Sequence, residues 1–224
     1  FFCFYNKKMF DEAGIKYPAP NWTWEDFLYI AKRLTKKDDK GIALQYGTNL
    51  SFVPVKQLCQ WIYQNGGKIF SDDKKRCVID EDKNTIEAIK FWVDMYKVHH
   101  VTPNPLSGEE QVVYQMFSAG RVAMVFFGRW AVPSFYFDKI KTFVWDVVPP
   151  PRGKRRVYLT TGPVGYSISA QSKHKEEAWK FLEFLASDEG QRISAELGWN
   201  IPPSRKIAYS DIFYKDKLNR LFVD

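Results

Sequence analysis

The sequence predicts an α/β fold in which strands alternate with helices around a largely parallel sheet. Short apolar runs alternate along the chain with stretches whose apolar residues recur at helical spacing. In addition, Val122–Phe127 is a run of six apolar residues, as expected for a strand that a covered sheet buries on both faces. Ligands of open α/β sheets bind where such strands end, so the residues after Phe127 are candidates for a site.

The first quarter of the chain is expected to begin with a short aromatic strand at residues 1–5 and a helical turn that Gly14 closes. Thr23 and Asp26 have the spacing of a capping box, which predicts that a helix starts after Thr23. Residues 41–50 are typical of a strand that leads into a loop.

The middle of the chain is predicted to hold a helix at residues 54–64, which an Asn-Gly-Gly sequence ends. A small hairpin with a charged turn is expected at 68–80. Two helices follow, at 84–98 and 109–119, and the second leads directly into the apolar strand. Trp61 and Trp92 fall on apolar helix faces and are predicted to belong to the core.

The last part of the chain predicts a strand at 143–148, a proline-stiffened turn and a strand at 157–169 that glycines interrupt. Ser172 is expected to cap a helix that runs to Ala186, with acidic residues in its first turn. The predicted buried face of this helix comprises Ala178, Phe181, Leu182 and Leu185.

Composition narrows the function classes. The aromatic share of 17%, with 18 Phe, 12 Tyr and 8 Trp, exceeds what a core of this size needs, which indicates that some rings line a surface or a cleft. The net charge of +7 comes from basic clusters beside Asp, Gly or Pro, without a basic stripe along a helix, which argues against nucleic-acid binding. The longest apolar runs are too short for a transmembrane helix.

Motifs of catalysis are absent from the sequence, which has no GxSxG, P-loop, GxGxxG or HExxH pattern. Paired carboxylates fall in predicted turns or helix starts, where acids are structurally favoured. The three cysteines lack metal-site spacing and are expected to be buried free thiols, with one disulfide as the alternative. His99 and His100 point to opposite sides of their element. We therefore predict no catalytic residue, no metal site and no cofactor.

Four groups of sequence stretches together resemble a known family in order and spacing. They are YNKKMFDEAGIKYPAPNWTWEDFLYIAKRLTK, then WIYQNGGKIFSDD with TIEAIKFWVDMYK, then QMFSAGRVAMVFFGRWAV, and finally DVVPPPRG, GPVGYSISAQSKHKEEAWKFLEFLASDEGQ and LGWNIPPSR. The family is extracellular solute-binding proteins, family 1, the carbohydrate receptors of ABC importers that are related to maltose-binding protein. The resemblance covers roughly residues 4–206. It implies a periplasmic-binding-protein-like type II α/β fold whose two lobes close on a ligand by hinge motion.

The resemblance also implies a domain organisation. The chain does not begin with Met and opens within a predicted strand, so we expect a mature or truncated segment. The fold would then be incomplete, lacking most of the N-terminal lobe. By analogy, residues 1–143 would form the second lobe, 144–186 would return to the first lobe, and 187–224 would return to the second.

The resemblance implies a set of ligand contacts. Trp130 matches a tryptophan that stacks on a sugar ring, and indole suits the C–H face of a pyranose. The alternative from the residues alone is that Trp130 is a core aromatic. The remaining candidates are glycines that let main chain approach the ligand, aromatic flanking surfaces and polar contacts to hydroxyls. They are Gly128 and Gly162, Trp199 and Tyr46, and Asn49 and Thr161, with both Tyr46 and Asn49 expected in a loop.

Arg129 departs from the family pattern, because it replaces the usual proline before the stacking tryptophan. Three readings stay open at this stage. Arg129 is a solvated charge at the rim, a packing partner, or a donor to an anionic or phosphorylated sugar, since a guanidinium group suits carboxylate and phosphate.

The sequence therefore predicts a non-catalytic, extracytoplasmic receptor that captures a carbohydrate and delivers it to the permease of an ABC importer. We expect a monomer without a membrane span of its own, either periplasmic or held at the cell surface as a lipoprotein. The alternatives are a receptor of the same fold for a sugar phosphate, polyamine or peptide, or a carbohydrate-active hydrolase.

Overall fold

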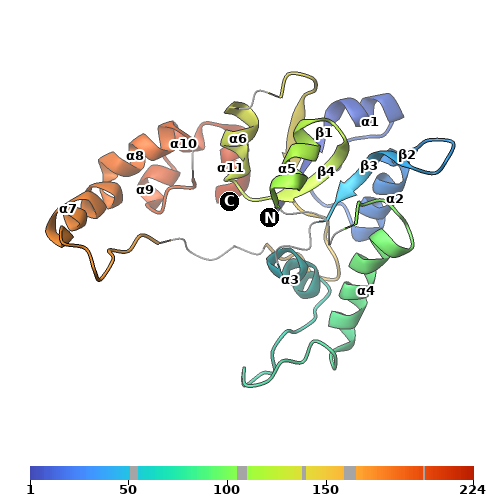
Figure 1. Cartoon of the computed structure of the whole chain (residues 1–224), viewed down its shortest axis with the longest axis horizontal. Coiled ribbons are helices and arrows are strands. Elements are labelled where there is room, and N and C mark those ends of the chain that lie inside the picture. Colours follow the sequence, from blue (N-terminus) through green and yellow to red (C-terminus); the bar gives the residue numbers. More distant parts are fainter. Residues whose placement is uncertain (51–54, 105–109, 138–139, 159–164, 199) are drawn as a thin grey trace. The chain divides into compact units, whose positions relative to one another are not determined.

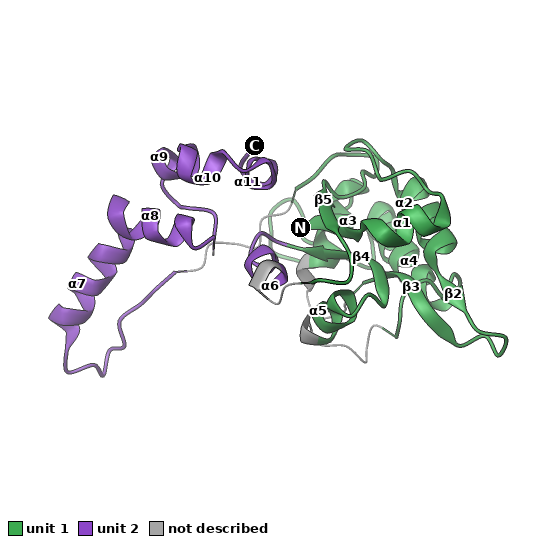
Figure 2. Ribbon diagram, turned by 90° about the horizontal axis from the view of Figure 1, so that it is seen from above, with its two compact units in different colours: residues 1–127, 139–160 green, residues 128–138, 161–224 purple. Residues whose placement is uncertain are grey.

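A computed structural model of the chain describes residues 1–50, 55–104, 110–137, 140–158, 165–198 and 200–224. The chain divides into two compact units, shown in different colours in Figure 2. Unit 1 comprises residues 1–127 and 139–160, and unit 2 comprises 128–138 and 161–224. These boundaries differ from the three predicted segments 1–143, 144–186 and 187–224, so the assignment of segments to lobes stays a prediction.

The described residues of unit 1 form a five-stranded sheet with the order β2-β3-β4-β1-β5. Figure 1 labels four of these strands, β1 to β4. The strands are β1 (Phe2–Asn6), β2 (Lys36–Lys37), β3 (Ala43–Asn49), β4 (Val122–Phe127) and β5 (Trp145–Val148). Only β3 and β4 pair in parallel, while the other neighbours are antiparallel. The prediction of a largely parallel sheet is therefore wrong. All six residues of β4 are buried as expected, but burial on both faces depends on what covers a strand and not on the direction of its neighbours.

In the described part of unit 1, five helices accompany this sheet. They are α1 (Lys7–Ala13), α2 (Trp24–Leu34), α3 (Val55–Gln64), α4 (Lys83–Lys97) and α5 (Glu110–Ser118). The observed ends of these helices differ by no more than one or two residues from the ends that the sequence predicted. The capping box is confirmed, because the Thr23 side chain accepts from the Asp26 backbone N–H and the Asp26 carboxylate accepts from the Thr23 backbone N–H.

Helix α2 packs directly on the sheet, and a glycine of β3 permits the close approach. A Cβ atom on Gly47 would lie 2.0 Å from the backbone oxygen of Ala31 in α2. The fully buried ring of Phe27 then contacts Trp61 and Phe126, each with ring centroids 5.5 Å apart. Trp92 is also buried, so the prediction that Trp61 and Trp92 belong to the core is confirmed.

Unit 2 is helical in its described part. Its helices are α6 (Ala131–Phe137), α7 (Lys175–Ala186), α8 (Asp188–Glu196), α9 (Arg205–Ala208), α10 (Asp211–Tyr214) and α11 (Lys217–Val223). Ala195, Ile207 and Phe213 form a small buried cluster, with Val223 packed against it. This cluster joins α8, α9 and α10, and among the described residues it involves far fewer side chains than the core cluster of unit 1.

Several local predictions are wrong. The expected hairpin at 68–80 forms no strands and is present only as one isolated antiparallel bridge between Phe70 and Cys77, with backbone hydrogen bonds from Ser71 to Arg76 O and from Val78 to Ile69 O beside it. Ser172 does not cap α7, which starts at Lys175, since its hydroxyl accepts from the backbone of His174. The described residues of the predicted strand at 157–169 form no strand, and 159–164 lie outside the described residues.

The predicted buried face of α7 is also wrong. No residue of this helix is buried, and Phe181 is 60% exposed. Amphipathic spacing gives a helix an apolar face but does not supply the element that covers it.

Two further properties concern the described residues only. No helix among them has both the length and the apolar content that crossing a membrane requires. All three cysteines are free, but burial is confirmed for Cys3 alone, because Cys59 is half-buried and Cys77 is exposed.

Candidate ligand-binding site

The segment that follows β4 explains why a glycine ends the apolar strand. The indole of Trp130 folds back over Gly128, where a Cβ atom would lie only 1.7 Å from the ring carbon Cζ3. Any side chain at position 128 would therefore displace the ring. Trp130 is 39% exposed, so the alternative that it is a buried core aromatic is wrong. The structure assigns Gly128 this role beside the indole, and its predicted main-chain contact to a ligand stays a prediction.

Helix α6 starts immediately after this indole. The backbone N–H of Ala131 donates to Gly128 O at 3.1 Å, and that of Val132 donates to Arg129 O at 3.0 Å. The strand end, the tryptophan and the helix start are thus joined within five residues, which limits the backbone freedom of Trp130.

Arg129 points away from solvent into unit 2. Its side chain is buried, and Nε donates to Asn219 Oδ1 at 2.7 Å while Nη1 donates to Gly198 O at 2.9 Å. The guanidinium carbon lies 5.5 Å from the ring centroid of Phe213. Of the three hypotheses for Arg129, the observed contacts agree with a packing partner, and the hypothesis of a solvated charge at the rim is wrong.

Asn219 is a residue of this arrangement that sequence reasoning missed. It is buried in α11, and its Nδ2 donates to the backbone oxygen of Phe213 at 2.9 Å while its Oδ1 accepts from Arg129. Asn219 lies 90 residues from Arg129 in the sequence, in a short helix without any recognisable motif. No local pattern could have paired the two.

Tyr46 and Asn49 lie in strand β3, so the expectation that they belong to a loop is wrong. Asn49 is the last residue of β3, and its buried side chain donates from Nδ2 to Met116 Sδ at 3.6 Å. Tyr46 is half-buried and pairs with Val122 at the start of β4, whereas Asn49 pairs with Val125 nearer its end. Asn49 is thus the closer of the two to the end of β4, and the ligand contacts of both remain predictions.

The other three candidates, Thr161, Gly162 and Trp199, lie outside the described residues. Their proposed contacts to a ligand stay predictions from the resemblance.

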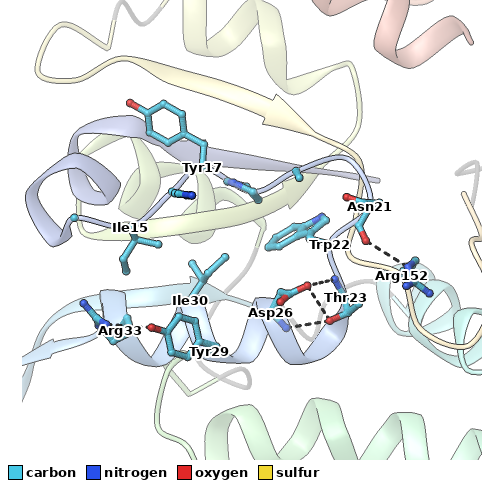
Figure 3. Close-up of a pocket in the computed structure, with 14 residues that line it drawn as sticks. Ile15, Tyr17, Asn21, Trp22, Thr23, Asp26, Tyr29, Ile30, Arg33 and Arg152 are labelled. Atoms are coloured by element: carbon cyan, nitrogen blue, oxygen red, sulfur yellow. Dashed lines mark hydrogen bonds between the residues drawn. The ribbon is translucent and has the colours of Figure 1, made fainter.

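Unit 1 carries a separate groove between the segment 14–23 and helix α2 (Figure 3), with a volume of about 590 Å³. In Figure 3 the side chain of Ile15 points from the segment toward Tyr29 and Ile30 of α2, whereas the ring of Tyr17 points away from this helix. Polar side chains along it already bond to the protein: Tyr17 donates to Asp11, Asp26 accepts from Thr23, and Arg152 donates to Asn21 O. None of the predicted ligand residues that the structure describes lines the groove.

Electrostatics give no sign of an acid catalyst in the described part of the chain. The carboxyl groups that depart clearly from their ordinary pKa there are Asp73, Asp82 and Glu87, and each has a lowered pKa because hydrogen bonds stabilise the carboxylate. Acid catalysis by a carboxyl group needs the opposite shift. Nor do the described residues bring together three His, Cys, Asp or Glu side chains that could hold a metal ion.

Comparison with known proteins decides the family. The model of the family "Bacterial extracellular solute-binding protein" matches residues 2–192. The chain belongs to this family. Its members are the solute-binding proteins of ABC transporters, and the resemblance drawn from the sequence is confirmed.

Individual relatives agree with this assignment. A curated relative from Streptomyces antibioticus, named an uncharacterized lipoprotein in the oleD 5' region, is 27% identical over 85% of this chain and 42% of its own length. The solute-binding protein Lmo0181 from Listeria monocytogenes, solved with cycloalternan, is 26% identical and has a TM-score of 0.78 over 99% of this chain and 56% of its own. A solute-binding protein from Thermotoga lettingae, solved with α-D-tagatose, is 27% identical and has a TM-score of 0.79 over 98% and 56%.

The coverage shows that the fold is partial. This chain spans about half the length of the curated relatives and solved structures that it matches. The predicted α/β fold of the two-lobed type is confirmed, since maltose-binding proteins of the MalE type match nearly the whole chain while it covers little more than half of theirs.

Proposed function

We propose that this chain is the larger part of an extracytoplasmic receptor that binds a carbohydrate between two lobes and delivers it to an ABC importer. The observation that carries the proposal is the half-exposed indole of Trp130, held over Gly128 directly after the buried strand β4. A rigid, flat aromatic ring beside a glycine offers a stacking surface for the C–H face of a sugar at low cost in conformational entropy. The sugars bound to the relatives from Listeria and Thermotoga support this ligand class.

The assignment of segments to lobes belongs to the same proposal. Residues 144–186 would return to the first lobe, while 1–143 and 187–224 would form the second. The exposed aromatic side chains of α7 support this, since Trp179, Phe181 and Phe184 are each at least 42% exposed. A helix with such side chains normally packs at least some of them against another element, which in the receptor would be the rest of the first lobe.

Binding would then shift the receptor toward a closed state. A ligand that contacts both lobes stabilises only the conformation in which both sets of contacts are made. The receptor would act without catalysis, as a monomer, in the periplasm or anchored at the cell surface as a lipoprotein, and would pass its ligand to the permease subunits. The lipoprotein among the relatives supports the second location.

A thermal-shift and calorimetric screen tests this proposal. It uses a receptor that contains this chain and is as long as the relatives that the chain matches. The screen holds neutral mono- and oligosaccharides, sugar phosphates, polyamines and short peptides. We expect a neutral sugar to raise the melting temperature, because a ligand at one hundred times its Kd stabilises the folded state by about 2.7 kcal/mol. A response to polyamines or peptides alone, or sustained turnover of a chromogenic glycoside, would contradict the proposal.

A further inference from the structure

We propose that Arg129 is a positioning residue for the stacking surface: it ties the segment that carries Trp130 to the C-terminal helices of unit 2. This inference rests on the proposed function and deepens it, because it assigns Arg129 to the presentation of the indole and not to contact with a ligand. The described contacts of Arg129 within unit 2 carry the argument.

The guanidinium group joins three separate segments. Nε donates to Asn219 of α11 at 2.7 Å, Nη1 donates to the backbone oxygen of Gly198 after α8 at 2.9 Å, and the group lies 5.5 Å from the ring of Phe213 in α10. The residue is 6% exposed. Hydrogen bonds from a charged donor are among the strongest in proteins, and burial protects them from competing water.

Asn219 completes the network and fixes its geometry. Its side-chain oxygen accepts from Arg129 while its side-chain nitrogen donates to Phe213 O at 2.9 Å, so both ends of the amide are in use. The amide thus connects the guanidinium group to the backbone of α10. Removing Arg129 would leave the buried Asn219 Oδ1 and the partly buried Gly198 O without this donor.

The network acts on Trp130 through the shortest covalent route, since Arg129 is bonded directly to it. The Trp130 ring lies against Gly128, the residue that precedes Arg129 in the chain. The backbone oxygen of Arg129 accepts a hydrogen bond from the N–H of Val132 in the first turn of α6. A shift of the Arg129 backbone would therefore move the indole. Gly198, which Arg129 holds at the other end, directly precedes Trp199 in the sequence.

The chemistry of the site follows from this assignment. A buried guanidinium group whose Nε and Nη1 already donate to protein acceptors is poorly placed to select a phosphate or carboxylate on the ligand. We therefore expect substitution of Arg129 to lower the affinity for neutral and for anionic sugars by the same factor.

The experiment uses the receptor at the length of its relatives, with the variants Arg129→Gln, Arg129→Lys and Asn219→Ala. The matched control is Arg220→Gln. Arg220 is exposed and lies in the same helix as Asn219, and its guanidinium carbon is 5.9 Å from the ring centroid of Tyr214. Calorimetry measures Kd for the best neutral sugar and its phosphorylated counterpart at a temperature where every variant is folded. A difference emission spectrum against the same protein with Trp130→Phe reports the surroundings of Trp130.

We expect Arg129→Gln and Asn219→Ala each to lower the affinity for both sugars about tenfold and to shift the Trp130 emission of the free protein. The double variant should lose less binding free energy than the sum of the two single losses. Arg129→Lys should fail to restore binding, because a lysine ammonium cannot reproduce the fork that reaches two acceptors. The control should retain wild-type affinity and emission.

Two results would overturn the inference. If Arg129→Gln lowers the melting temperature but leaves affinity and emission unchanged, Arg129 has a structural role only. If it weakens the phosphorylated sugar alone and Arg129→Lys restores binding, Arg129 contacts the ligand. Should no sugar bind the wild-type receptor, the proposed function fails, while the emission of Trp130 still decides whether Arg129 positions the ring.

Discussion

Helix α2 in unit 1 and helix α7 in unit 2 carry similar sets of apolar side chains, but only one of them is covered. The buried residues of α2 are Trp24, Phe27, Ile30, Ala31 and Leu34, whereas α7 has none. The sheet of unit 1 supplies a partner for α2, down to the glycine of β3 that lets the two approach. Most helix stability in proteins comes from such packing, so the two helices should contribute very differently to the stability of this chain.

The N-terminal cap is also better formed in α2 than in α7. Thr23 and Asp26 exchange reciprocal hydrogen bonds with the backbone at the start of α2. The residue that precedes α7 is His174, and its side chain makes no cap hydrogen bond. In unit 1 the cap and the packed face reinforce each other, while α7 lacks both.

The largest effect is expected from removing one aromatic ring in each helix of the 224-residue chain. Phe27→Ala should lower the free energy of unfolding by about 3–5 kcal/mol, because its fully buried ring leaves a cavity among Trp22, Trp61 and Phe126. The matched change Phe181→Ala should cost no more than about 0.5 kcal/mol, since that ring is mostly exposed. Urea unfolding measures both. Equal costs would show that α7 is packed in this chain as firmly as α2.

A smaller effect is expected at the caps. Thr23→Ala should lower the free energy of unfolding by about 1 kcal/mol, because the N–H of Asp26 loses its acceptor. His174→Ala, at the equivalent position of α7, should leave stability within about 0.5 kcal/mol of the wild type. Urea unfolding of the two variants side by side makes the comparison, and a cost at His174 as large as that at Thr23 would contradict it.

The smallest effect concerns pH and the caps of two other helices. In α4 of unit 1, the Asp82 carboxylate accepts from the N–H and the hydroxyl of Thr85, both at 2.8 Å, and these bonds lower its pKa. Because the pKa is lower in the folded than in the unfolded chain, the stabilisation is complete above the unfolded value of about 3.9 and is lost as the pH falls through the folded value. Helix α8 of unit 2 is capped by the hydroxyl of Ser187, which does not titrate in this range.

Amide hydrogen exchange at pH 6 and pH 3, corrected for intrinsic rates, separates these two caps. Protection of the Thr85 amide should fall at the lower pH, and Asp82→Asn should remove most of this pH dependence. Protection of the Gly190 amide, which donates to Ser187, should change less. A larger acid effect at Gly190 than at Thr85 would be inconsistent with the two caps as described.

Local signals predicted the elements of unit 1 well. Apolar spacing placed α2 and α4, the capping pair placed the start of α2, and the six-residue apolar run placed β4. These features depend on residues near one another in the chain. The direction of the strands that flank β4 depends on how distant segments return to the sheet, and for that reason the parallel sheet was predicted wrongly.

The candidate site was predictable only in part. The glycine before Trp130 pointed to a close approach, and the structure identifies the indole itself as the approaching group. Arg129 had three open readings, because its acceptors Gly198 and Asn219 lie 69 and 90 residues away. Position in the sequence carries no information about such pairs. The exposed face of α7 likewise depends on which segments are present to cover it, and spacing within the helix does not report that.

Calorimetry of the best sugar with Trp130→Ala tests the central claim most directly, in a receptor that carries this chain at the length of its relatives. Tyr209→Ala is the matched control, since it removes another exposed aromatic ring of unit 2. If the indole of Trp130 forms the stacking surface, affinity should fall at least about tenfold, or ~1.4 kcal/mol, in the Trp130 variant and remain unchanged in the control. Equal affinity of the wild type and Trp130→Ala would contradict the account.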